Sequence, residues 1–289
     1  MDIIVAKECG FCMGVKMAVN TAKDCLKTSG SVYCLGQLIH NKSVTDSLQS
    51  DGLIFVEHID MVPNGSQLII RSHGVGEKVY EIAREKDIKI IDATCPYVSK
   101  IHRIVKRHYD DGFNIIIVGK KAHPEVEGIN GWCNHSAKVV ECEDDLVDID
   151  CNALYCVVSQ TTNSKQLFDK IVKKIEKLGV NTLDFFDTIC YTTSVRQREA
   201  DLVAKKCDVM LVLGNQNSAN TNKLLDVCRK NCDSSFLITS LADLQSLQDL
   251  FLQSRRVGIT AGASTPQEFV DTVVSYINTN FADSRTDIL

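Results

Sequence analysis

Three cysteines, Cys12, Cys95 and Cys190, each follow a short strand-like run and precede a segment with helical periodicity. They lie 83 and 95 residues apart, so they come from separate parts of the chain. The start of a helix favours a thiolate, and Pro96 suits the first helical position because proline lacks an N–H. Three such thiolates could hold a [4Fe–4S] cluster or zinc and leave one metal position open. We therefore predict a three-part protein whose parts share one metal centre.

The other cysteines of this chain suit structural roles better. Cys9 forms a C-x-x-C with Cys12, which alone suggests half a zinc site or a thiol–disulfide pair. The sequence has no second C-x-x-C, so we interpret Cys9 as a bystander, with a role as a further ligand left open. Cysteines in or beside apolar runs are expected to be small buried hydrophobes, namely Cys34, Cys142, Cys156 and Cys207.

Polar clusters follow many of the predicted strands, where open α/β sheets bind ligands. His40, His73 and His123 each stand beside Gly, Asn or Pro at such a strand end. Ser218 with Asn220, and Ser264, belong to segments that open helices, whose backbone N–H groups bind phosphate. Few Lys or Arg residues accompany them. This pattern favours a pocket for a short diphosphate held by many hydrogen bonds.

Glu125, two residues after His123, is the natural proton carrier, although acidic residues favour the first turn of a helix in any case. The His123-Pro124-Glu125 triplet also resembles the H-x-E of zinc deaminases, but their P-C-x-x-C is absent. Neither G-x-G-x-x-G after the first strand nor G-x-x-x-x-G-K-[ST] occurs, so electrons for a redox reaction must come from outside the chain.

Strand-like and helical patterns alternate along nearly the whole chain. Strands are predicted at residues 3–6, 31–35, 53–56, 67–71, 88–91, 114–118, 154–159, 209–213, 235–239 and 257–260. Helices are predicted at residues 15–27, 41–49, 77–86, 98–109, 164–178, 194–206, 221–231 and 267–280. This alternation predicts an α/β fold of mainly parallel sheets. We expect three α/β modules, residues 1–94, 95–189 and 190–289, and the first strand could pack with the third module instead.

The composition and charge of the chain favour a globular protein over a nucleic-acid-binding or membrane-spanning one. The 289 residues are 44% hydrophobic and 24% charged, which is typical of a globular protein. A net charge of −5 argues against a nucleic-acid binder. The N-terminus lacks the pattern of a secretory signal and no apolar run is long enough to span a bilayer, so we expect a cytoplasmic protein. Thirteen cysteines, an odd number, then make a disulfide framework improbable in a reducing compartment.

Taken together, these motifs resemble 4-hydroxy-3-methylbut-2-enyl diphosphate reductase, the LytB family, over essentially the whole chain. The matching segments contain the polar and cysteine motifs in order: Gly10-Phe11-Cys12-Met13-Gly14-Val15, His40-Asn41, Ser72-His73-Gly74-Val75, Asp92-Ala93-Thr94-Cys95-Pro96, His123-Pro124-Glu125-Val126-Glu127-Gly128, Gln160-Thr161-Thr162, Ile189-Cys190-Tyr191-Thr192-Thr193, Asn217-Ser218-Ala219-Asn220 and Thr260-Ala261-Gly262-Ala263-Ser264.

The resemblance implies the last step of the non-mevalonate isoprenoid pathway, with isopentenyl and dimethylallyl diphosphates as products. It implies three modules in a cloverleaf around a [4Fe–4S] cluster on Cys12, Cys95 and Cys190, with ferredoxin or flavodoxin as electron donor. Glu125 would deliver protons through Thr161. The residues that would bind the substrate are His40, His73, His123, Thr161, Ser218, Ala219, Asn220 and Ser264. Two positions depart from the family pattern: Lys7-Glu8-Cys9 replaces Asn-Pro-Arg, and Ala219 replaces a common Ser, so only its backbone N–H remains for binding.

Two other classes of function are compatible with parts of this pattern. A non-catalytic iron–sulfur sensor would explain the three cysteines but leaves Glu125, Thr161 and the anion pocket without a role. A zinc hydrolase with a Cys-ligated metal would yield a colourless, metal-loaded protein. The resemblance favours the reductase over both.

Overall fold

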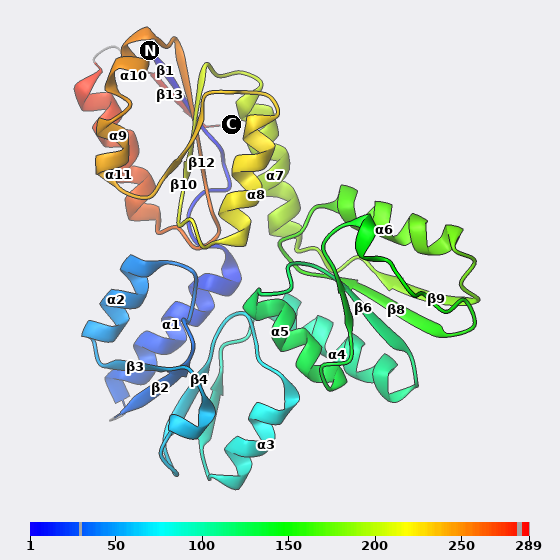
Figure 1. The fold of residues 1–289 in the computed structure, drawn as a ribbon. Helices are drawn as coiled ribbons and strands as arrows, with labels where there is room; N and C mark the ends of the chain where they lie inside the picture. The colour runs from blue at the N-terminus through cyan, green and yellow to red at the C-terminus, as the bar shows by residue number, and fades with distance from the viewer. Residues whose placement is uncertain (29–30, 282–284, 289) are drawn as a thin grey trace. The chain divides into compact units, whose positions relative to one another are not determined.

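The computed structural model describes residues 1–28, 31–281 and 285–288, which form two compact units. The first unit comprises Met1–Met13, His40–Lys42 and Tyr191–Leu289, and the second comprises Gly14–Ile39 and Ser43–Cys190. The strands lie in three sheets in which every described pair is parallel, with helices between successive strands (Figure 1). The prediction of an α/β fold with parallel sheets is therefore confirmed. None of the described helices combines the length and apolar character needed to cross a bilayer.

The sheet near the start of the second unit has the strand order β3-β2-β4-β5. Its strands are β2 (Val32–Leu35), β3 (Leu53–Val56), β4 (Gln67–Ile70) and β5 (Lys89–Asp92), and its helices are α1 (Met13–Thr28), α2 (Lys42–Ser50), η1 (Ile59–Met61) and α3 (Glu77–Glu85). Figure 1 shows α1 and α2 on one side of this sheet and α3 on the other. Covered on both faces, the strands have the near-continuous apolar character of a parallel sheet.

The other sheet of the second unit has the order β7-β6-β8-β9. Its strands are β6 (Asn114–Val118), β7 (Lys138–Val140), β8 (Leu154–Ser159) and β9 (Thr182–Phe186), and its helices are α4 (Pro96–Asp110), α5 (Pro124–Asn130), η2 (Gly131–Cys133), η3 (Glu143–Asp145) and α6 (Lys165–Lys177). Ile101 and Val105 of α4 pack with Val126 of α5 in one buried cluster, while Phe168 and Ile171 of α6 belong to another. These apolar faces sandwich the strands.

The first unit contains one five-stranded sheet with the order β11-β10-β12-β1-β13. Its strands are β1 (Asp2–Val5), β10 (Val209–Leu213), β11 (Ser235–Ile238), β12 (Arg256–Ala261) and β13 (Arg285–Ile288), and its helices are α7 (Tyr191–Ala204), α8 (Ala219–Arg229), α9 (Leu241–Gln245), α10 (Gln248–Gln253) and α11 (Gln267–Asn280). In Figure 1, α7 and α8 lie on one side and α9, α10 and α11 on the other. The first strand of the chain therefore joins the sheet of the last strands, one of the two placements that the sequence left open.

All three sheets share one order of strands. Numbered along each module, the order is second, first, third, fourth, as in β3-β2-β4-β5 and β7-β6-β8-β9. The first unit repeats it as β11-β10-β12-β1, with the N-terminal strand β1 in the fourth position. The fourth-position strands β5, β9 and β1 are the strands that precede Cys95, Cys190 and Cys12. The weak sequence repeat around the cysteines thus corresponds to a repeat of topology.

Two glycine contacts bring the sheets of the second unit together at the loop after β4. A Cβ atom on Gly131 would lie 2.5 Å from Gly76 Cα, and a Cβ atom on Gly128 would lie 3.2 Å from the backbone of Gly74. The Trp132 indole N–H also donates to the Val75 carbonyl oxygen at 2.9 Å. Only glycine permits this backbone approach, which fixes the loop after β4 against α5 and η2.

Replacing Gly131 with alanine is expected to lower the free energy of unfolding by about 2 kcal/mol or more, because the added methyl group meets backbone that cannot rotate away. Urea unfolding of the Gly131→Ala variant measures this. Gly112→Ala is the matched control, since Gly112 has φ +86° but open space around it, and it reports backbone strain of about 1 kcal/mol without a clash. Equal destabilisation of the two variants would argue against the close contact.

Candidate functional site

The three cysteine turns share one hydrogen bond. The Cys95 N–H donates to the Ser72 carbonyl oxygen, the Cys190 N–H to that of Thr161 and the Cys12 N–H to that of Ala263, each at 3.0 Å. Each acceptor lies two residues beyond the end of the third-position strand of the same sheet, β4, β8 or β12. Every module thus fixes one cysteine beside the loop that follows the neighbouring strand.

An aspartate three residues earlier shapes two of these turns. Asp92 Oδ1 accepts from the Thr94 N–H at 2.9 Å, and Asp187 Oδ1 accepts from the Ile189 N–H at 3.2 Å. Such side-chain turns stabilise a tight exit from a strand. These aspartates were not predicted as functional residues, although the Asp-x-x-Cys spacing that the two turns share was a usable signal.

The three turn cysteines differ from most of the others in their surroundings. Cys12, Cys95 and Cys190 are half-buried, and each lies immediately before a helix, α1, α4 or α7. Burial raises the pKa of Cys9 to about 11 and the pKa values of five others, so these groups stay protonated thiols: Cys34, Cys133, Cys156, Cys207 and Cys228. Cys142 is exposed, which contradicts the prediction that it is buried, because it caps the short helix η3 at the surface.

The predicted polar residues lie at the topological switch points of the sheets. In the order second-first-third-fourth, the switch point lies between the first and third strands, where ligands bind in open α/β sheets. His40 and His73 follow β2 and β4; His123 and Thr161 follow β6 and β8; Ser218 and Ser264 follow β10 and β12. The sequence could place them at strand ends, but only the strand order shows that these strands are neighbours.

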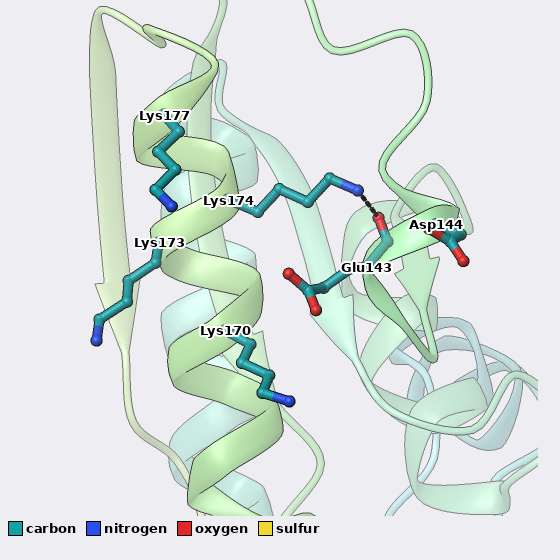
Figure 2. A pocket seen from close by; sticks show the side chains of 6 residues that line it. All are labelled: Glu143, Asp144, Lys170, Lys173, Lys174 and Lys177. Carbon is teal, nitrogen blue, oxygen red and sulfur yellow. Dashed lines mark hydrogen bonds between the residues drawn. The ribbon is translucent and has the colours of Figure 1, made fainter.

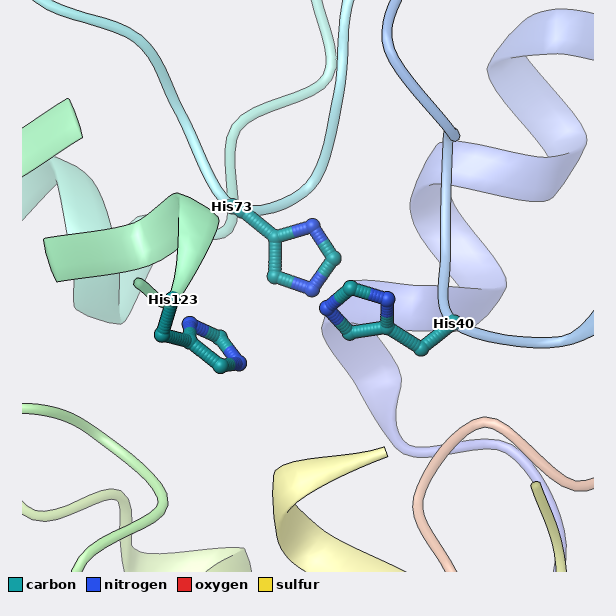
Figure 3. Close-up of side chains that lie close together, drawn as sticks. All are labelled: His40, His73 and His123. Carbon is teal, nitrogen blue, oxygen red and sulfur yellow. The ribbon is translucent and has the colours of Figure 1, made fainter. Parts of the chain in front are cut away.

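His73 and His123 lie side by side in the second unit. Their rings meet edge to face with centroids 5.6 Å apart. Figure 3 draws both side chains in close-up. The glycine contacts described above bring their two loops together. His123 also caps α5, since its Nδ1 accepts from the Glu125 N–H at 3.1 Å.

His40, also drawn in Figure 3, belongs to the first unit together with Ser264. The Ser264 hydroxyl donates to the His40 carbonyl oxygen at 3.0 Å, and the Asn41 amide donates to the Ser264 carbonyl oxygen at 2.8 Å. These reciprocal bonds fix the segment after β2 on the loop after β12. Asn41 is therefore a positioning residue. It belongs to the motif His40-Asn41, but the sequence did not indicate its role.

The start of α8 carries a buried polar side chain, that of Asn220. Ser218 caps the helix by accepting from the Thr221 N–H at 3.3 Å. Asn220 is buried, and among the described residues neither its amide nitrogen nor its amide oxygen has a hydrogen-bond partner. An unpaired buried amide is costly. This end of α8 is therefore suited to a polar ligand.

Glu125 and Thr161 are joined by two hydrogen bonds. The Thr161 N–H donates to Glu125 Oε1 at 2.6 Å and the Thr161 hydroxyl donates to Glu125 Oε2 at 2.7 Å, while Glu125 is only 2% exposed. Burial raises the pKa of Glu125 from 4.5 to about 7, and the two bonds from Thr161 act in the opposite direction. Because the Thr161 carbonyl oxygen also accepts from Cys190, this pair is tied directly to a cysteine turn.

The raised pKa of Glu125 predicts a pH-dependent contribution to stability. Between pH 4.5 and about 7 the folded chain holds a proton that the unfolded chain has lost, so the free energy of unfolding falls as pH rises through this window. The total decrease should be about 3 kcal/mol. Urea unfolding of wild type and Glu125→Gln between pH 5 and pH 8 isolates it, and a pH-independent difference between them would contradict the buried carboxyl group.

The hollow drawn in Figure 2 lies apart from these residues. It is lined by lysines of α6 and two acids of η3, namely Lys170, Lys173, Lys174, Lys177, Glu143 and Asp144. The Lys174 ammonium donates to the Glu143 carbonyl oxygen at 2.6 Å. No predicted site residue lines it, so this hollow belongs to the charged surface of the second unit.

A protein-family model and curated relatives both match nearly the whole chain. Residues 3–278 match the family model described as LytB protein. A 4-hydroxy-3-methylbut-2-enyl diphosphate reductase from Clostridioides difficile (strain 630) is 41% identical over 280 residues, covering 96% of this chain and 99% of the relative. One from Clostridium perfringens (strain 13 / Type A) is 41% identical over 281 residues, with coverages of 96% and 98%.

Two solved structures are also similar. The E-1-hydroxy-2-methyl-but-2-enyl-4-diphosphate reductase from Plasmodium falciparum aligns with a TM-score of 0.92 at 30% identity, covering 100% of this chain and 92% of its own. The (E)-4-hydroxy-3-methyl-but-2-enyl diphosphate reductase described as the terminal enzyme of the non-mevalonate pathway has a TM-score of 0.71 at 37% identity, with coverages of 96% and 100%.

Proposed function

The chain belongs to the LytB protein family, and from this premise we propose that it is a 4-hydroxy-3-methylbut-2-enyl diphosphate reductase. The reaction takes (E)-4-hydroxy-3-methylbut-2-enyl diphosphate, two electrons and two protons to isopentenyl or dimethylallyl diphosphate and water. The allylic C–O bond breaks, the oxygen leaves as water and a new C–H bond forms. The observation that carries the proposal is the hydrogen bond that all three cysteine turns repeat beside the polar residues of the switch points.

Family membership implies a metal-containing cofactor, and we propose a [4Fe–4S] cluster on Cys12, Cys95 and Cys190. The donor set fits, because these thiols are half-buried at helix starts while burial keeps six others protonated. Gly14, two residues after Cys12, lies so close to Cys95 that an added Cβ would be 2.7 Å from its Sγ atom. When bound, a cluster with three protein ligands supplies single electrons and a Lewis-acidic iron toward the hydroxyl leaving group.

The diphosphate would be held by the polar side chains of the switch points and by backbone N–H groups at the start of α8. These residues are His40, His73, His123, Ser218, Ala219, Asn220 and Ser264. The edge-to-face pair of His73 and His123 and the buried amide of Asn220 support this assignment. His40 directly follows Ile39, which belongs to the unit of His73 and His123, so the chain itself links the two groups of residues.

Glu125 and Thr161 would carry the proton to the leaving hydroxyl group. A carboxyl group with a pKa of about 7 is protonated in about half of the molecules at neutral pH, which suits a general acid. The Thr161 hydroxyl, which donates to Glu125 Oε2, can pass a proton onward by accepting from Glu125 and donating to the substrate. Burial of the pair keeps bulk water from exchanging that proton.

Electrons would come from a ferredoxin or flavodoxin. The sequence lacks the G-x-G-x-x-G dinucleotide-binding fingerprint after its first strand, so we assign the supply of electrons to a separate donor protein. The thirteen cysteines, an odd number, suit a reducing compartment, and we place the reaction in the cytoplasm.

Anaerobic purification followed by iron and sulfide counting, spectroscopy and a turnover assay tests the proposal. We expect about four irons and four sulfides per chain and formation of both products with a chemical or protein reductant. Bound zinc with hydrolytic activity would instead identify a zinc hydrolase. A cluster without turnover of the substrate would identify an iron–sulfur sensor.

A further inference from the structure

Arg196 of α7 is a buried cation that bridges two backbone segments of the first unit. Its side chain is only 2% exposed, and its Nη1 and Nη2 atoms donate to the carbonyl oxygens of Ala261 and Gly10, each at 2.9 Å. Ala261 ends β12, and Gly10 lies in the loop between β1 and α1 that carries Cys12. The planar guanidinium group therefore joins the Cys12 loop to the strand that pairs with β1.

The same loop is fixed at every second residue. The Glu8 N–H donates to Glu199 Oε2 at 2.8 Å, Gly10 accepts from Arg196, and the Cys12 N–H donates to the Ala263 carbonyl oxygen at 3.0 Å. Glu199 lies one turn after Arg196 on α7, so a single helix face provides two of the three attachments. A Cβ on Gly10, whose φ is +80°, would lie 2.5 Å from Gln267 Oε1, so α11 closes the loop from another direction.

Among the described residues, Arg196 is held by backbone carbonyl oxygens and not by a salt bridge. Within the described part of the chain, the side chain enters no ion pair and its Nε atom has no hydrogen-bond partner. A buried cation without a counter-ion is costly. Such a residue is expected where two carbonyl oxygens must be held at once in fixed directions.

We infer that Arg196 is a positioning residue that holds the Cys12 loop in its metal-binding conformation before the metal arrives. The inference rests on the proposed function only in taking Cys12 as a ligand. Lysine cannot replace it, because one ammonium group lacks the fork that reaches two carbonyl oxygens in fixed directions.

Hydrogen exchange of the full chain before cluster reconstitution provides the test. Arg196→Lys keeps the charge and Arg196→Met removes it, while Arg198→Met, at an exposed position of the same helix, is the matched control. We expect exchange at the amides of Glu8 and Cys12 to be about tenfold faster in both Arg196 variants and unchanged in the control. Iron bound after reconstitution should fall in the two Arg196 variants, with their thermal unfolding monitored in parallel.

Wild-type exchange rates at Glu8 and Cys12 in folded Arg196→Lys would overturn the inference. If protection were then lost only in Arg196→Met, the positive charge alone would hold the loop, and the two hydrogen bonds of the guanidinium group would not be needed. If Arg196→Met does not fold, the lysine variant decides. A wild-type chain that takes up no iron and sulfide would instead contradict the proposed function. The exchange data on the Arg196 variants do not depend on that result.

Discussion

Cys95→Ser is expected to give a folded chain that holds less than about a tenth of the wild-type iron and turns over at least about a thousandfold more slowly. A serine hydroxyl is not ionised at neutral pH and is a harder ligand than a thiolate, so the third protein bond to the cluster is lost. The turn itself should persist, because the Cys95 amide bond to Ser72 and the Asp92 side-chain turn involve no sulfur. Iron and sulfide counting, circular dichroism and turnover measure these three effects.

Cys142→Ser is the matched control, because Cys142 is the exposed cysteine that caps η3 and serine preserves a capping side chain. It should keep the full metal content and turnover. Full activity of Cys95→Ser would remove Cys95 from the ligand set.

Glu125→Gln is expected to keep the cluster and to bind substrate while turnover falls by about 10²- to 10⁴-fold, the usual contribution of general acid catalysis. Glutamine has nearly the same shape but cannot release a proton to the Thr161 hydroxyl. Wild-type turnover should also decline as pH rises through about 7, where the Glu125 carboxyl group loses its proton. Steady-state kinetics between pH 6 and pH 9, with substrate affinity measured separately, would show both effects.

Glu127→Gln tests whether the loss is specific to this carboxyl group. Glu127 lies in the first turn of the same helix, but its side chain is exposed. It should alter turnover less than about twofold. If Glu125→Gln retained near-normal turnover, the proton would have to come from another group.

Hydrophobic periodicity predicted most of the fold, because helices and parallel strands bury different faces. The predicted strand at residues 114–118 and the helix at residues 267–280 agree with β6 and α11 residue for residue. Pro96 begins α4 as predicted. The strands β7 and β13 and the helices α5, α9 and α10 were not predicted. Helices of five to seven residues are too short to establish a period, and the two strands lack a continuous apolar run of four residues.

The order of the strands could not be read from the sequence, because pairing joins residues that are distant along the chain. Ile3 pairs with Val257, and no local pattern distinguishes this partner from a strand of the nearest module. The module boundaries at residues 94 and 189 stay a prediction, and the structure groups the first two sheets in one compact unit. Glycines such as Gly76 and Gly131 make that grouping possible, yet in the sequence they resemble ordinary turn residues.

The candidate site was predictable to the extent that its residues follow strands. Strand-end position identified Cys12, Cys95, Cys190 and the histidines, and the family pattern added Thr161. Arg196 was missed because it lies in the middle of a helix, where an arginine normally faces solvent. Only the tertiary contacts with Gly10 and Ala261 distinguish it from Arg198.

The pairing of β1 with β12 sets an order for assembly during synthesis. The first strand leaves the ribosome long before residues 256–261, which supply its partner, and the carbonyl oxygens of Ala261 and Ala263 that secure its following loop emerge later still. The nascent chain can complete two of its three cysteine turns while translation continues, but the one nearest the N-terminus must wait for the end. Loading of the proposed cluster is therefore expected after release of the finished polypeptide, and a ribosome-stalled chain lacking residues 256–289 should bind no complete cluster.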